Sequence, residues 1–89
     1  MTHHIVKSWP KYFEPMLKGI KKHDMRNMKD RSYSVGDTMT LQEFDPFEGK
    51  YTGRTADFRI TYKTNRETPC ALSSAMLDDN AVILSVEKI

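Results

Sequence analysis

Hydrophobic and polar residues alternate most clearly over residues 55–63, and a period of two is typical of a β-strand with one buried face. The apolar positions of this stretch, expected to point inward, are Ala56, Phe58, Ile60 and Tyr62. Shorter stretches predict further strands over 2–8, 23–28, 38–45 and 81–87. The last of these is apolar on both faces, so we expect it to lie in the centre of a sheet.

A different spacing follows Ser8. Four apolar residues recur at intervals that predict a helix with one buried stripe: Phe13, Met16, Leu17 and Ile20. Pro10 stands in the first turn of this helix, where its missing N–H group costs nothing. Gly19 fits the position just after the helix, where a left-handed backbone conformation ends it.

Pro15 conflicts with an uninterrupted helix. At that position the proline ring removes one backbone hydrogen bond and crowds the carbonyl of Lys11. We therefore expect either a kink, or a separate turn over 10–13 followed by a short helix that begins at Pro15.

Turn-forming residues predict the remaining connections. Residues 34–37 form a turn in which Asp37 accepts a hydrogen bond, 45–50 form a hairpin loop, and 70–77 form one or two helical turns. Five strands and one main helix in 89 residues predict a single α+β domain over 1–89, curved or barrel-like.

The net charge of +2 conceals an uneven distribution. Residues 7–31 carry eight basic and three acidic side chains, whereas residues 38–89 carry six basic and eight acidic ones. One side of the fold is therefore expected to attract polyanions. A solvated lysine-rich helix face would give the same count, so this alternative stays open.

The segment 19–26 places both signs of charge on one short element. If it forms a strand, Lys22, Asp24 and Arg26 project from the same face. Charged groups are costly to bury, so these side chains either point into water or line a polar pocket.

A pocket for a phosphate or a base needs fixed cations, a hydrogen-bond acceptor and an aromatic ring. The predicted ligand-binding residues are the cations Lys7, Lys21, Arg26 and Arg31, the acceptor Asp24, and the rings Trp9 and Tyr33. Tyr33 is expected to be exposed, because its turn is polar. Structural roles remain as alternatives: an ion pair of Asp24 with Arg26, core packing of Trp9, and bracing of the turn by Asp30 and Arg31.

In these residues the chain resembles the ASCH superfamily, whose signature is Gly-x-Lys-x-x-Glu-x-Arg. Gly19, Lys21 and Arg26 match this signature, and Asp24 takes the glutamate position as the shorter acid. The chain is most similar to a family of short bacterial and phage proteins of unknown function. The segments that carry this similarity are 7–13, 30–37, 43–46, 49–54 and 82–86.

The resemblance implies a small five-stranded PUA-like β-barrel with one main helix covering an opening. It also implies a cleft between helix and barrel that binds RNA or nucleotides. Some ASCH branches are enzymes, including amidohydrolases for acetylated cytidine in which a Lys, a Thr and a Glu are thought to act together. A few branches are reported nucleases.

The second hypothesis is therefore a small hydrolase of a modified nucleoside or of RNA. Its catalytic candidates are Lys21 and Asp24, with Glu43 or Asp57 as the third acid. Lys21 matches the lysine of the amidohydrolases, but Asp24 stands where they have the threonine, and this mismatch favours binding over catalysis.

A third hypothesis is a phage-type role in which the chain engages a host protein, since the hairpin over 44–47 carries two phenylalanines. No metal and no cofactor is expected, because the three histidines and the single cysteine lack the spacing of metal ligands. The chain has no apolar run near the roughly 20 residues of a membrane span and no apolar leader segment. With one cysteine, Cys70, it has no internal disulfide, so we expect it in the cytoplasm.

Overall fold

The computed structural model describes residues 1–29 and 31–89, so Asp30 lies outside the described residues. It contains one sheet with the strand order β1-β3-β4-β5-β2. The elements are β1 (His3–Ser8), α1 (Pro10–Leu17), β2 (His23–Asn27), β3 (Thr38–Asp45), β4 (Lys50–Thr64), α2 (Ser73–Met76) and β5 (Ala81–Lys88). Each predicted strand is present, and β5 lies between β4 and β2 as expected.

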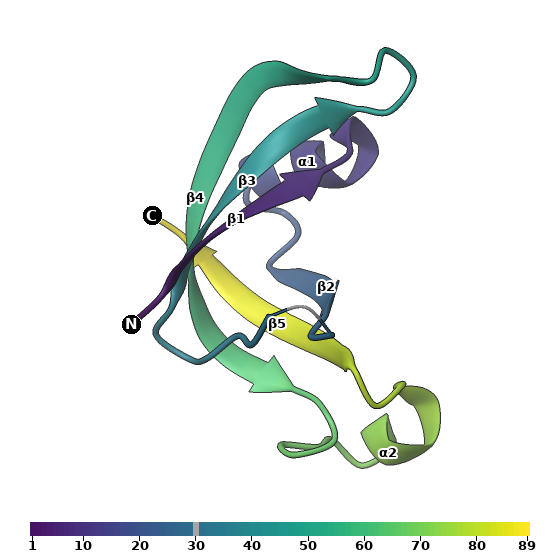
Figure 1. Ribbon diagram of the computed structural model, residues 1–89. Helices are drawn as coiled ribbons and strands as arrows, with labels where there is room; N and C mark the ends of the chain where they lie inside the picture. The colour runs from purple at the N-terminus through teal and green to yellow at the C-terminus, as the bar shows by residue number, and fades with distance from the viewer. Residues whose placement is uncertain (30) are drawn as a thin grey trace.

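The sheet curls along β4, the longest strand with 15 residues. The first part of β4 pairs antiparallel with β3, and its last part pairs antiparallel with β5 (Figure 1). β1 lies parallel to β3, and β2 lies antiparallel to β5. Within the described residues no backbone pairing joins β1 to β2. The fold is mostly β, and its sheet is a curled half-barrel that is open along the seam between these two strands.

Side chains that alternate along the strands meet on the inner face of the curl. The buried apolar residues are Val6, Phe13, Met16, Tyr33, Met39, Leu41, Ala56, Phe58, Ile60, Val82, Leu84 and Val86. Tyr62 departs from the predicted alternation and is exposed. The register with β5 shifts between Ile60 and Tyr62, and a bulge of this kind turns the following side chain to the other face.

The expected exposure of Tyr33 is wrong. Only 3% of Tyr33 is exposed, and its ring lies 4.6 Å from that of His4, centroid to centroid. Lys63 also donates a hydrogen bond from Nζ to the Tyr33 carbonyl. The polar residues next to Tyr33 in the sequence do not predict its burial, because the contacts that bury it come from distant strands.

α1 is one continuous helix with Pro15 inside it, so the alternative of two separate elements is wrong. A kink at Pro15 stays a prediction. Gly19 has a φ of 75°, as its place after the helix predicts. The N–H groups of Gly19 and Ile20 donate to the carbonyls of Met16 and Pro15, which is the Schellman pattern of a glycine-terminated helix.

A buried pair joins the start of β1 to the turn before β3. Asp37 Oδ2 accepts hydrogen bonds from His4 Nε2 at 2.9 Å and from the Ser34 N–H at 3.0 Å, and Oδ1 accepts one from the Thr2 N–H. Burial raises the pKa of Asp37, but these three hydrogen bonds outweigh it and hold the pKa below its ordinary value. Asp37 therefore acts as the predicted turn acceptor and also fixes the edge strand.

Replacing Asp37 should make the protein less stable and less sensitive to acid. Asp37→Asn leaves buried donors without their carboxylate, at a cost of about 1–3 kcal/mol in the free energy of unfolding. Because the folded pKa of Asp37 is lowered, its stabilisation is present above the ordinary carboxyl pKa of about 4 and is lost as the pH falls through the folded value.

Urea unfolding from about pH 7 to about pH 3 measures both effects. The difference between wild type and Asp37→Asn should shrink as the pH falls. The exposed Asp78, replaced by Asn, is the matched control. A difference between wild type and Asp37→Asn that stays constant across this range would contradict the assignment.

Candidate functional site

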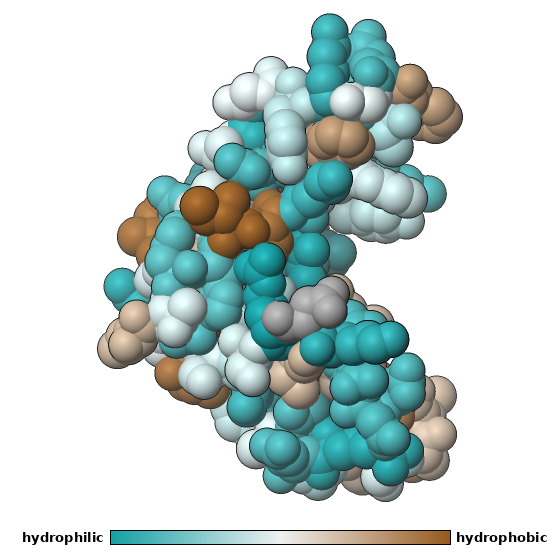
Figure 2. All heavy atoms as spheres, viewed as in Figure 1, coloured by the Kyte–Doolittle hydropathy of each residue, from teal (hydrophilic) through white to brown (hydrophobic). Residues whose placement is uncertain are grey.

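A pocket of about 380 Å³ lies at the seam between β1 and β2, beside the first turns of α1. Its lining residues are Lys7, Ser8, Trp9, Tyr12, Lys21, Asp24, Met25 and Arg26, and we call it the seam pocket. The surface is hollowed on the side where α1 and β2 lie (Figures 1 and 2). The volume falls within the range of small-molecule sites in proteins.

The end of α1 positions the cationic side of this pocket. The carbonyl of Pro15 accepts hydrogen bonds from the N–H groups of Ile20 and Lys21, which holds the chain close to the helix as it leaves. β2 then begins, and strand alternation turns Asp24 and Arg26 inward while Met25 is exposed. The predicted shared face of Asp24 and Arg26 is confirmed, whereas Lys22 precedes β2 and is exposed.

Arg26 spans the seam that the backbone leaves open. Its Nε donates to Asp24 Oδ2 at 2.6 Å, and its Nη1 donates to the carbonyl of Lys7 in β1 at 3.1 Å. Arg31 makes a similar contact further along the edge, from Nη1 to the carbonyl of Ile5 at 3.4 Å. The two arginines thus occupy carbonyls on the free edge of β1. The ion pair and the pocket, which the sequence left as alternatives, are both present.

Two aromatic rings form the wall on the α1 side. Trp9 and Tyr12 stack with a centroid distance of 6.3 Å and an interplanar angle of 27°, and each is about half exposed. Lys21 Nζ lies 5.4 Å from the Tyr12 ring centroid. Core packing of Trp9 is therefore wrong. Tyr12 was missed as a site residue, although its spacing of three from Trp9 at a helix start was the signal that could have found it.

The charge of the seam pocket is positive, with the cations Lys21 and Arg26 against one carboxylate, Asp24. Lys7 also lines the pocket, but its Nζ lies over a ring outside the lining. Lys7 Nζ lies 4.1 Å from the centroid of the Phe44 ring. Ser8 was also missed, because it closes the predicted first strand and carries no distinguishing signal in the sequence.

Two predicted site residues do not line the seam pocket. The Arg31 guanidinium reaches the β1 edge, and Tyr33 is in the core. Burial raises the pKa of Tyr33 against the opposing charges of Arg26 and Arg31, so the buried phenol stays protonated at neutral pH. The predicted bracing of the turn by Asp30 with Arg31 falls on a residue outside the described residues.

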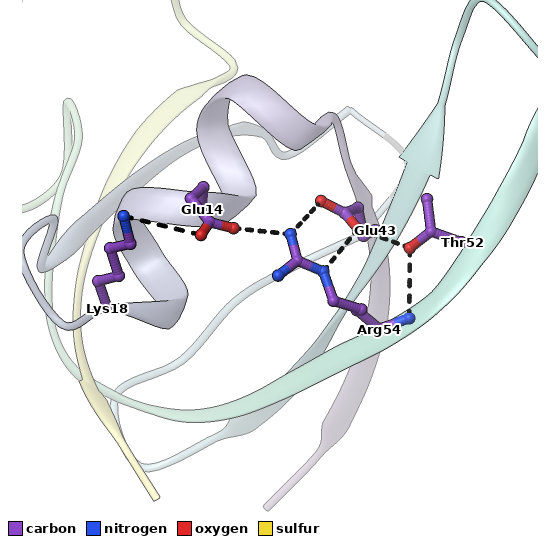
Figure 3. A network of polar contacts seen from close by, with 5 residues as sticks. All are labelled: Glu14, Lys18, Glu43, Thr52 and Arg54. Atoms are coloured by element: carbon purple, nitrogen blue, oxygen red, sulfur yellow. Dashed lines mark hydrogen bonds and ion pairs between the residues drawn. The ribbon is translucent and has the colours of Figure 1, made fainter.

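A polar network fixes α1 to the sheet (Figure 3). Glu43, buried in β3, accepts hydrogen bonds from Arg54 Nε and Nη2 at 2.9 Å each and from Thr52 Oγ1 at 2.6 Å. Arg54 Nη2 also donates to Glu14 Oε2 of α1 at 2.6 Å. The hydrogen bonds from Arg54 lower the pKa of Glu43 despite its burial, so Glu43 stays ionised.

Neither candidate for a third catalytic acid belongs to the seam pocket. Glu43 is fully engaged by Arg54 and Thr52, and Asp57 is exposed on β4, where it accepts a hydrogen bond from Thr40. The other two catalytic candidates, Lys21 and Asp24, do line the seam pocket. In the part of the chain that the structure describes, they form no ion pair with each other, and Asp24 pairs with Arg26 instead.

Within the described residues 1–29 and 31–89, no three side chains of His, Cys, Asp or Glu gather in a way that could hold a metal ion. No helix in the same ranges has both the length and the apolar character that crossing a membrane requires.

Comparison with known proteins gives one family and one relative. Residues 2–86 match the family model described as "Domain of unknown function (DUF3850)". The "Uncharacterized 12.9 kDa protein in GpA 3'region" of Escherichia phage P2 is 44% identical over 62 residues, which are 70% of this chain and 54% of that protein. The chain therefore spans about half the length of this relative. The predicted similarity to phage proteins of unknown function is confirmed.

The contact of Asp24 with Arg26 should show strong energetic coupling. The two side chains are 11% and 21% exposed, so solvent screens them little, and a hydrogen bond between charged groups of this kind is worth about 1.5–3 kcal/mol. A double-mutant cycle with Asp24→Asn and Arg26→Gln, followed by urea unfolding, measures this coupling.

The matched control is the exposed pair Glu48 and Lys50 at 3.7 Å, for which the coupling should be about 0–1 kcal/mol. Equal coupling in the two cycles would mean that the seam contact contributes no more than a surface ion pair.

Proposed function

The chain belongs to the family described as a domain of unknown function (DUF3850), and we propose that it binds RNA or a nucleotide in the seam pocket. The observation that carries this proposal is the meeting of two cations, Lys21 and Arg26, with one carboxylate and two stacked aromatic rings in one pocket. These groups come from α1 and its N-cap residue Trp9, from β2 and from the segment between α1 and β2, so the fold and not the local sequence brings them together.

Each group has a partner in a nucleotide. Lys21 and Arg26 attract the phosphate, and their contacts release counterions from the strand. The half-exposed face of Trp9 stacks a base, and such stacking is worth about 1–3 kcal/mol per base. Asp24 Oδ2 accepts a hydrogen bond from Arg26. Within residues 1–29 and 31–89 no donor reaches the second oxygen, Oδ1. Oδ1 is therefore the atom that accepts a hydrogen bond from a base amino group.

Membership of the ASCH superfamily with its PUA-like barrel is part of this proposal. The matched signature residues support it, because Lys21, Asp24 and Arg26 all line the seam pocket. The open half-barrel with α1 beside its seam is consistent with a cleft between helix and barrel.

Binding is favoured over hydrolysis by the same geometry. A lysine nucleophile needs an adjacent base, and Lys21 Nζ lies over the Tyr12 ring while Asp24 is held by Arg26. The pocket therefore offers charge and stacking surface, which suffice for a ligand that is held and released unchanged.

Removing one pocket cation should weaken RNA binding and its dependence on salt. For wild type, the affinity for single-stranded RNA should fall as salt rises between about 50 and 200 mM. Lys21→Ala should lower the affinity and reduce the slope of log K against log salt by about 0.7, the value for one phosphate contact on a single strand.

Lys22→Ala is the matched control, because it removes the same charge at the next residue, which is exposed and does not line the seam pocket. Fluorescence anisotropy with labelled single-stranded and structured RNA gives the slopes. The proposal fails if neither RNA binds in a salt-dependent way, or if both variants change binding equally.

A further inference from the structure

A second concave surface continues from the seam pocket around the start of α1. It has a volume of about 490 Å³, and we call it the aromatic groove. Its lining residues are Trp9, Pro10, Lys11, Tyr12, Asp45, Pro46 and Phe47. Trp9 and Tyr12 line both surfaces, so the two share one aromatic wall.

The far side of the aromatic groove is the tip of the β3–β4 hairpin. Phe47 is 97% exposed there, which is an unfavourable position for a large apolar ring that has nothing to bind. The tip is held in place before any ligand arrives, because Asp45 Oδ1 accepts hydrogen bonds from the N–H groups of Phe47 and Glu48 at 2.9 and 3.3 Å. A hairpin backbone that is already ordered reduces the ordering cost of binding.

We propose that the aromatic groove takes the next base of a single-stranded RNA whose phosphate lies in the seam pocket. The ligand is then an oligonucleotide of at least two nucleotides, and this inference rests on the proposed function. A chain that leaves the seam pocket past Trp9 enters the groove directly, where Phe47 and Tyr12 offer ring faces and Lys11 offers a cation for the connecting phosphate.

The continuity of the wall favours a base over a protein side chain as the occupant. A protein partner would need only the groove, whereas a nucleic acid strand uses the cations and the rings together, and every base has a face that stacks without sequence preference. The groove has one cation, Lys11, and one carboxylate, Asp45, so its net charge is near zero; Lys11 is left to meet the connecting phosphate, and the rings select for flat apolar surface.

The test compares ligands of increasing length: adenosine 5′-monophosphate, and 5′-phosphorylated adenylates of two and four nucleotides. Quenching of Trp9, the single tryptophan, reports on both surfaces at once. Wild type should bind the dinucleotide roughly 5- to 150-fold more tightly than the monophosphate, as expected for one added stacked base.

Phe47→Ala should abolish most of this gain and leave binding of the monophosphate unchanged, while Phe47→Tyr should keep the gain. Tyr62→Ala is the matched control, because Tyr62 is exposed but lines neither surface. Both Phe47 variants should fold, since the side chain is almost fully exposed.

The outcomes separate this inference from the proposed function. The inference is overturned if the monophosphate binds but the dinucleotide binds no more tightly, or if its tighter binding survives Phe47→Ala. The seam pocket would then remain a nucleotide site, and Phe47 would be free to serve a protein partner. No salt-dependent binding of any of the three ligands removes the proposed function as well.

Discussion

The Arg26 side chain joins the two edge strands of a sheet that no backbone pairing closes within residues 1–29 and 31–89. Its contacts with Asp24 in β2 and with the Lys7 carbonyl in β1 replace the ladder of hydrogen bonds that a complete barrel would have at this place. A side chain holds strands further apart than a backbone ladder does. The seam therefore stays open as a pocket, and the residues that keep it open also give it charge.

The position of α1 depends on a second long-range contact. Glu43 in β3 binds Arg54, and Arg54 reaches Glu14 on the helix, so three elements are joined through one guanidinium. Phe13 is fully buried beneath it, with the Arg54 guanidinium 5.3 Å from its ring centroid. This arrangement places the stacked wall of the helix start beside the seam, and the cations and the rings then face one ligand.

Much of the fold and five of the eight residues that line the seam pocket could be predicted from the sequence. Alternation placed Asp24 and Arg26 on one face, because register along a single strand is a local property. Alternation failed at Tyr62, where a bulge depends on the partner strand. The polarity of its turn gave the wrong exposure for Tyr33, whose burial depends on contacts with distant elements. The ion pair between Glu43 and Arg54 joins the two strands of a hairpin, and no residue spacing in the sequence predicts it.

Amide chemical shifts test most directly whether the seam between β1 and β2 is the binding surface. A titration of ¹⁵N-labelled protein with a single-stranded RNA tetranucleotide should shift the signals of Ser8, Tyr12, Lys21 and Met25, together with the Trp9 indole N–H. The outer face of the sheet, with Asp57 as its reporter, should stay unchanged. Saturable shifts confined to that outer face, or no saturable shifts at all, would contradict binding at the seam.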